Sequence, residues 1–114
     1  MTLQLETARR LLAKASDDQY ILTHLADDGA APVWPLGFHA QQEVEKALKA
    51  VLALHGVEYP LTHNLAMLLA MLAQRQIAAP PDAGELPRLT PFGVAFRYDD
   101  LAPAEEVLLD RNWA

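Results

Sequence analysis

The chain contains no cysteine. Disulfide bonds and thiolate metal sites are therefore excluded, and a reducing compartment is the simplest location for the protein. The first ten residues, MTLQLETARR, lack the apolar core preceded by basic residues that a secretory signal requires. We therefore expect a cytoplasmic protein.

Long apolar runs are also missing. The longest apolar-looking segment, residues 65–73, is about half of the roughly 20 residues that a membrane-spanning helix needs. We predict a buried helix there and no association with a membrane. The chain also lacks the alternation of β-branched and polar residues that is typical of strands, so no sheet is predicted.

Positive charge is scarce. Nine Lys and Arg residues stand against 15 Asp and Glu residues, which gives a net charge of −6. Broad, sequence-independent binding to nucleic acid relies on many contacts from Lys and Arg to phosphate, so we expect no DNA ligand. A small local phosphate site and a basic protein partner are both compatible with this charge.

Apolar residues recur at helical spacing along most of the 114 residues, a length that fits one domain over residues 1–114. Prolines inside the fourth predicted segment can divide it into two short helices. Short connectors between helices favour an all-α, up-and-down bundle of four to five helices. The predicted helices cover residues 3–27, 36–55, 63–75 and 85–98, and a final short helix opens at Pro103.

Local signals indicate where these helices begin. Residues 29–37, GAAPVWPLG, contain two prolines and two glycines and are predicted to be a loop. Thr62 is predicted to be the N-cap of the third helix, and Thr90 with Pro91 the N-cap and first turn of a short helix. Because the final helix is short, its uncovered apolar stripe favours burial against a second copy, and we expect a homodimer.

The second predicted helix carries the most informative polar residues. His39, Glu43 and Lys46 follow one another at spacings of four and three, so they share one helix face. One interpretation is a solvated face with weak intrahelical ion pairs, between Glu43 and Lys46 and between Glu45 and Lys49, each contributing about 0.2–0.5 kcal/mol. The other is a patch in which His39 and Lys46 hold a phosphate while Glu43 orients the histidine. A neighbouring polar row consists of Gln42, Glu45 and Lys49.

Metal binding is not predicted. His39 and Glu43 could share a metal ion, but no HExxH or similar run is present, and His63 could join them only through the fold. We expect no metal and no cofactor. His63 itself either caps and packs at the start of the third helix or makes a polar contact to the second helix. The adjacent carboxylates Asp17 and Asp18 are interpreted as residues of a helix end or solvated turn, not as an acid/base pair.

Arg97 and Tyr98 close the fourth predicted segment. Arg97 could form a salt bridge to Asp100 or to a neighbouring helix, or could bind a phosphate through its planar guanidinium group. Tyr98 could pack its ring against the bundle or stack it on a base.

Three of these segments together resemble the HEPN domain family. Residues 38–50, FHAQQEVEKALKA, resemble the second-helix signature of that family, and Thr62-His63-Asn64-Leu65 resembles the start of its next helix. Arg97-Tyr98 is similar to the Arg-Tyr pair near the end of its fourth helix, and the resemblance covers about residues 3–112. It implies a helical bundle that usually dimerises. It also implies partnership with a small nucleotidyltransferase encoded nearby, often as a toxin–antitoxin pair.

The same resemblance implies several activities. In several branches the domain is a metal-independent RNase, and a nucleotide-binding role has been proposed. In some pairs the nucleotidyltransferase adds AMP to a tyrosine of its HEPN partner, for which Tyr98 is the best-placed candidate here. The RNase branches carry an Arg followed a few residues later by a His, whereas no histidine follows Arg97 in this chain. The usual RNase motif is therefore absent.

We accordingly predict a binding module that pairs with a nucleotidyltransferase and contacts a nucleotide or an RNA phosphate. Its predicted groove would gather polar groups from the second, third and fourth helices. One alternative is an RNase that uses Arg97 with His39 or His63. Another is a purely structural interaction module. The predicted nucleotide- or phosphate-binding residues are His39, Glu43, Lys46, Arg97 and Tyr98.

Overall fold

The computed structural model describes residues 2–95 of the chain. Over this range it contains helices and no strand, which confirms the predicted all-α class. The predicted final helix, Arg97 and Tyr98 lie outside the described residues. The elements are α1 (Thr2–Ala26), α2 (Val33–Leu54), α3 (Leu65–Gln74), the 3-10 helix η1 (Leu86–Leu89) and α4 (Thr90–Ala95).

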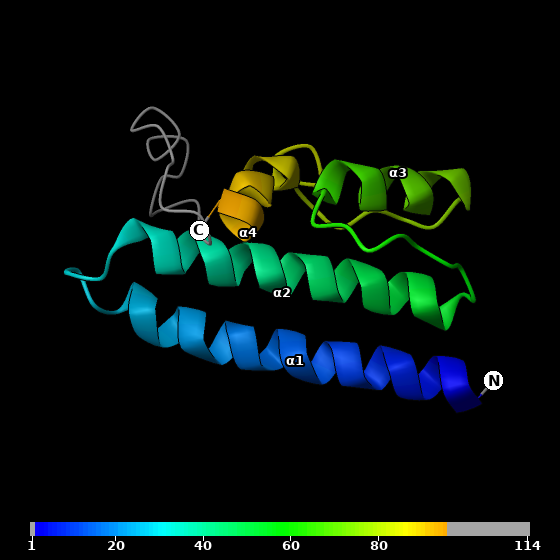
Figure 1. Ribbon diagram of the computed structural model, residues 1–114, viewed down its shortest axis with the longest axis horizontal. Helices are drawn as coiled ribbons and strands as arrows, with labels where there is room; N and C mark the ends of the chain where they lie inside the picture. Colours follow the sequence, from blue (N-terminus) through cyan, green and yellow to red (C-terminus); the bar gives the residue numbers. More distant parts are fainter. Residues whose placement is uncertain (1, 96–114) are drawn as a thin grey trace.

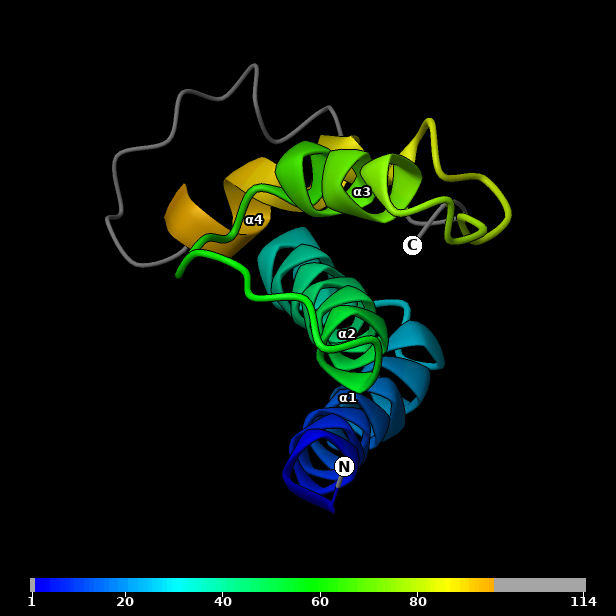
Figure 2. The ribbon, with the colours of Figure 1, turned by 90° about the vertical axis from the view of Figure 1, so that its right-hand side faces the viewer.

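Helix α2 lies at the centre of the bundle. Figure 1 shows α1 running antiparallel to α2 on one side, with α3 and α4 on the other side. The view in Figure 2, turned by 90°, shows the same three layers, and α1 packs mainly against α2. No helix in residues 2–95 combines the length and apolarity needed to cross a membrane.

The core lies between α2 and the layer formed by α3, η1 and α4. Its fully buried members include Leu52 of α2, Leu68 and Leu72 of α3, and Phe92 of α4. Burying a side chain of this size stabilises the fold by about 1.5–3 kcal/mol. The 3.6-residue spacing of apolar residues in α2 and α3 therefore fixes which faces of these helices meet.

The start of α2 differs from the sequence-based prediction. The predicted loop over residues 29–37 is wrong from Val33 onward, because the helix begins there. Pro35 lies in the first turn, where backbone N–H groups have no partner inside the helix, so its missing N–H costs little. Gly37 is buried, and a Cβ atom at this position would overlap the ring of Phe92. The glycine therefore permits α4 to approach α2 closely.

The start of α3 is stabilised by residues from two parts of the chain. Asn64 is its N-cap, because Asn64 Oδ1 accepts a hydrogen bond of 3.2 Å from the N–H of Met67. The prediction that Thr62 has this role is wrong, since its hydroxyl accepts instead from the N–H of Asn64. The hydroxyl of Thr90 accepts from the N–H of Leu65 at 3.1 Å. Thr90 therefore provides a hydrogen-bond acceptor to the first turn of α3. The predicted division of the fourth segment into two short helices is confirmed.

Candidate functional site

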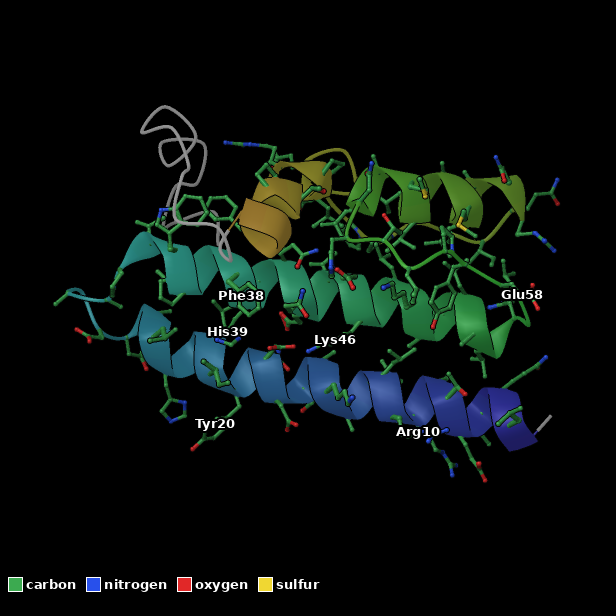
Figure 3. All side chains as sticks on the ribbon, viewed as in Figure 1. Arg10, Tyr20, Phe38, His39, Lys46 and Glu58 are labelled. Atoms are coloured by element: carbon green, nitrogen blue, oxygen red, sulfur yellow. The ribbon has the colours of Figure 1, made fainter. Side chains whose placement is uncertain are left out.

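The polar side chains of α2 divide into two groups that face different neighbours. At about 100° per residue, His39, Glu43 and Lys46 share one face, and Gln41 and Glu45 lie roughly 140° around the helix. Figure 3 shows His39 and Lys46 between α2 and α1. The spacing in the sequence therefore separates two sites that face different layers of the bundle.

The first group surrounds Asp18, a residue of α1 that is only 6% exposed. Asp18 Oδ1 accepts a hydrogen bond of 2.9 Å from His39 Nδ1, and Oδ2 accepts one of 2.6 Å from Lys46 Nζ. Because an ionised carboxylate can only accept, Nδ1 of His39 carries a proton. Burial, and then the negative charge of Asp18, raise the pKa of Glu43. We call Asp18, His39, Glu43 and Lys46 the Asp18 cluster.

The role of Asp18 corrects two predictions. It lies inside α1 and is buried, so its interpretation as a residue of a helix end or solvated turn is wrong. Lys46 binds Asp18 across the helix interface, and the pairing with Glu43 considered from the sequence is not formed among the described residues. Helical spacing could have indicated this, because Asp18 lies on the same face of α1 as the buried Ala8 and Ala15 and the half-buried Leu22.

The second group surrounds Glu45, which is 4% exposed. Its carboxylate accepts three hydrogen bonds of 2.8 Å, from Gln41 Nε2, Lys49 Nζ and His63 Nδ1. The intrahelical pair of Glu45 with Lys49, considered from the spacing, is confirmed. His63 precedes α3 and makes the polar contact to α2 that was one of its two predicted alternatives. We call Gln41, Glu45, Lys49 and His63 the Glu45 cluster.

Hydrogen bonding keeps Glu45 ionised despite its burial. Burial alone would raise the pKa of Glu45, but hydrogen bonds from Lys49, Gln41 and His63, together with the charge of Lys49, lower it. Gln41 also donates a bond of 3.2 Å to the backbone carbonyl of His63. The cluster therefore ties the connector between α2 and α3 to the middle of α2.

The predicted site residues are thus only partly brought together. His39 and Lys46 meet at Asp18, whereas His63 binds Glu45 on a different face of α2. The described residues do not assemble the single groove that the sequence predicted. Every buried side-chain nitrogen or oxygen in this part of the chain has a hydrogen-bond partner. Within residues 2–95, no group of three or more His, Asp or Glu side chains is placed to hold a metal ion.

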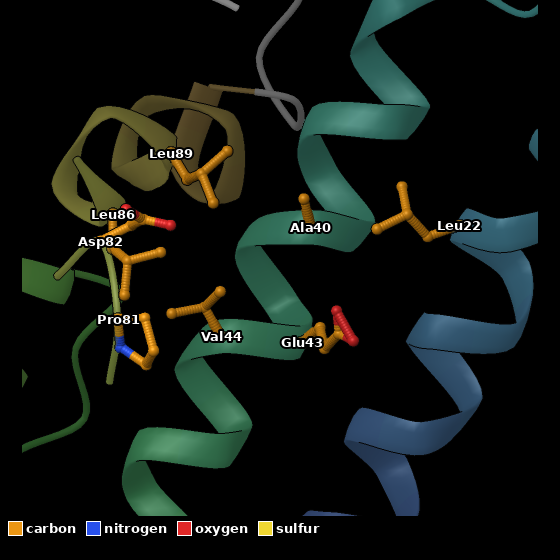
Figure 4. A pocket seen from close by; sticks show the side chains of 8 residues that line it. All are labelled: Leu22, Ala40, Glu43, Val44, Pro81, Asp82, Leu86 and Leu89. Carbon is orange, nitrogen blue, oxygen red and sulfur yellow. The ribbon is translucent and has the colours of Figure 1, made fainter. Parts of the chain in front are cut away.

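A largely apolar groove runs beside the Asp18 cluster, between α1, α2 and the segment that leads into η1. One part, of about 370 Å³, is lined by Leu12 of α1, by Val44 and Leu48 of α2, and by Pro81. A second part, of about 180 Å³, extends it to Leu22, Ala40, Asp82 and Leu89 (Figure 4). Glu43, Val44, Pro81 and Leu86 line both parts, so we treat them as one feature, the α1–α2 groove.

Comparison with known proteins identifies the family. The family model described as HEPN domain matches residues 5–111, a range that includes both polar clusters and the α1–α2 groove. No curated protein and no solved structure gives a significant match. The match confirms the resemblance to the HEPN domain family that the sequence indicated. The chain therefore belongs to the HEPN domain family.

Proposed function

We propose that this HEPN domain protein is a binding module that pairs with a small nucleotidyltransferase in a toxin–antitoxin-type system. Membership of the family over residues 5–111 supports the pairing. HEPN domains commonly dimerise, so we propose a homodimer as the unit that meets the nucleotidyltransferase. The absence of cysteine is consistent with a cytoplasmic pair.

The observation that carries this proposal is the match of the HEPN domain model over residues 5–111, and the polar residues of α2 are compatible with it. Asp18 binds both His39 and Lys46, and Glu45 binds Lys49 and His63. Groups that hold the helices together in this way already have partners. These polar residues therefore have a structural role in the bundle, and the case for a protein partner rests on membership of the HEPN domain family.

Within this proposal, the Asp18 cluster supplies part of a nucleotide or RNA-phosphate contact. The side chains of His39 and Lys46 are each 23% exposed, which leaves an edge of the cluster open to a ligand. Because Asp18 already offsets the charge of Lys46, tight binding of a phosphate requires another cation. Arg97, with a planar guanidinium that suits phosphate, is the proposed source, and Tyr98 beside it would stack on a base.

Co-purification tests the pairing. The chain is co-expressed with the small nucleotidyltransferase encoded by the adjacent gene, and only one of the two proteins carries an affinity tag. We expect the two proteins to elute together at a fixed ratio, and an unrelated nucleotidyltransferase to stay unbound. Separate elution, or an adjacent gene that encodes no nucleotidyltransferase, would overturn the pairing.

Calorimetry with ATP or a short RNA tests the phosphate contact. We expect Arg97→Ala to weaken binding at least about tenfold, the equivalent of 1.4 kcal/mol. Lys14→Ala, which removes an exposed cation of α1, is the matched control and should leave binding unchanged. If the two substitutions weakened binding equally, binding would depend on the net charge of the protein and not on a specific contact from Arg97.

A second candidate function, RNA cleavage, is favoured by the bond between Asp18 and His39. A carboxylate that holds Nδ1–H of an imidazole orients its Nε2 for proton transfer. In this alternative, Nε2 of His39 takes the proton of a 2′-hydroxyl, that oxygen bonds to phosphorus, and the 5′-oxygen leaves with a proton from solvent. Incubation with total RNA should then show cleavage that both His39→Ala and Arg97→Ala abolish. If the native protein cleaves RNA no more than the Arg97→Ala variant does, this candidate function is excluded.

A further inference from the structure

The α1–α2 groove has an apolar wall on α1 that stays open to the outside. This wall extends from Leu12 to Leu22, ten residue steps that cover about 15 Å at 1.5 Å per residue. Leu12 is 52% exposed, so the other described residues leave this part of the wall uncovered. A continuous exposed apolar surface is a common mark of a site that binds another protein. The groove is long enough for roughly three turns of a helix.

Two carboxylates line this otherwise apolar groove. Glu43 of α2 lines both of its parts, and Asp82, in the segment that leads into η1, lines one of them. In the view of Figure 4, Ala40 and Val44 lie between these two acidic side chains. The groove therefore combines an apolar surface with a local negative charge.

Glu43 has no cation paired with it among residues 2–95. The other polar members of its helix face, His39 and Lys46, both bind Asp18 instead. Burial and the negative charge of Asp18 raise the pKa of Glu43, so its ionisation at neutral pH costs the free chain stability. Side chains that cost stability in the free protein are common at functional sites. The carboxylate of Glu43 is therefore available to a cation that a bound partner brings.

The chemistry of the groove distinguishes between possible occupants. A segment with apolar side chains and one Lys or Arg would match both the apolar lining and the carboxylates. A second copy of this chain would instead bring a further net charge of −6 and the same two carboxylates toward this surface. A different, less acidic protein avoids that repulsion, and the nucleotidyltransferase is the protein partner of the proposed function.

We propose that the α1–α2 groove is the surface through which this chain binds the nucleotidyltransferase, by taking up an apolar segment of that protein whose Lys or Arg pairs with Glu43. This inference rests on the proposed function and names the surface and the chemistry of the pairing. The new ion pair offsets the cost of ionising Glu43. Partner binding and the stability of the free chain therefore place opposite demands on this residue.

Glu43→Gln tests the ion pair, because it removes the charge and keeps the shape of the side chain. Calorimetry with the purified nucleotidyltransferase encoded by the adjacent gene measures the dissociation constant for the native chain and each variant. We expect Glu43→Gln to weaken binding about tenfold or more. The same substitution should stabilise the free chain, so the loss of binding could not arise from unfolding. Glu58→Gln, which removes an exposed carboxylate of the connector, is the matched control and should weaken binding less than about twofold.

Leu12→Asp tests the apolar part of the groove independently. It places a charge on the exposed wall, where a bound apolar segment would bury it, so we expect binding to weaken about tenfold or more. Leu3→Asp is the matched control. Leu3 is also an exposed leucine of α1, and nine residues at 100° per residue place it on the opposite side of that helix. The Leu3→Asp variant should bind as the native chain does.

The possible results separate this inference from the pairing itself. If the native chain, Glu43→Gln and Leu12→Asp all bind the nucleotidyltransferase equally well, the pairing stands and the groove is not its site. If the native chain does not bind the nucleotidyltransferase, the pairing and this inference both fail. Sedimentation of the chain alone tests the competing occupant. A homodimer that dissociates in the Leu12→Asp variant would assign the groove to a second copy and overturn the proposal.

Discussion

Replacing Glu45 with glutamine should destabilise the fold strongly, although the two side chains have almost the same shape. Glu45 accepts hydrogen bonds from three donors, Gln41, Lys49 and His63. A glutamine offers one oxygen acceptor, and its amide N–H groups would face at least one of these donors. Its neutral side chain would also leave the ammonium group of Lys49 without its anion.

The size of the effect follows from burial. Removing one partner of a buried ion pair costs about 3–5 kcal/mol. The side chain of Lys49 is 12% exposed, so it can reach toward water and recover part of that penalty. We expect Glu45→Gln to lower the free energy of unfolding by about 2–3 kcal/mol, a large share of the roughly 5–15 kcal/mol typical of a domain.

Urea unfolding followed by circular dichroism measures this loss. Glu58→Gln, which changes an exposed carboxylate of the connector, is the matched control and should stay within about 0.5 kcal/mol of the native protein. The folded-state pKa of Glu45 is lowered from 4.5, so its contribution is present above pH 4.5 and is lost as the pH falls through the folded pKa. The difference between native protein and Glu45→Gln should therefore shrink in acid.

Two results would refute this account of the Glu45 cluster. One is a loss for Glu45→Gln no larger than that of Glu58→Gln. The other is a failure of Lys49→Gln to restore stability in the Glu45→Gln background, since removing the unpaired cation should relieve most of the penalty.

Three further substitutions have defined outcomes. Glu43→Gln should raise the free energy of unfolding at neutral pH by about 0.5 kcal/mol. The reason is that the folded-state pKa of Glu43 is raised from 4.5, so ionisation of its carboxyl group in the folded protein costs stability. The gain should diminish as the pH falls toward 4.5, and urea unfolding at pH 7 and at pH 4.5 measures both values. Gly37→Ala should cost about 1–3 kcal/mol, since its Cβ would overlap the buried ring of Phe92, whereas Gly84→Ala, with open space around it, should change stability little in the same assay. Asn64→Ala should cost about 1 kcal/mol through loss of the N-cap of α3, and a melting temperature equal to that of the native protein would contradict this role.

Periodicity in the sequence predicted the long helices well. The first helix, predicted over residues 3–27, is observed as α1 at Thr2–Ala26. These helices bury one or two continuous apolar stripes, and such stripes are visible without knowledge of their partners. The starts of the helices were harder to predict from the sequence. Pro35 and Gly37 indicated a loop, yet the first turn tolerates the proline, and the contact of Gly37 with Phe92 exists only in the folded chain.

The polar residues show which contacts could be predicted from the sequence and which could not. Spacing grouped His39 with Lys46 and paired Glu45 with Lys49, because these relations lie within one helix. Spacing could not pair Asp18 with Lys46, which is 28 residues away along the chain. The sequence also placed His63 in the same groove as His39, whereas the way α1 and α3 pack on opposite sides of α2 separates them.

The arrangement of α1 has a consequence for how the protein opens. Since α1 rests mainly on α2, it can peel away at the expense of one interface, while the core shared by α2, α3, η1 and α4 persists. Backbone amides of α1 should therefore exchange with deuterated water sooner than those in the middle of α2, whose release requires the whole molecule to unfold. Separation of α1 from α2 would thereby uncover Asp18, His39 and Lys46 all at once.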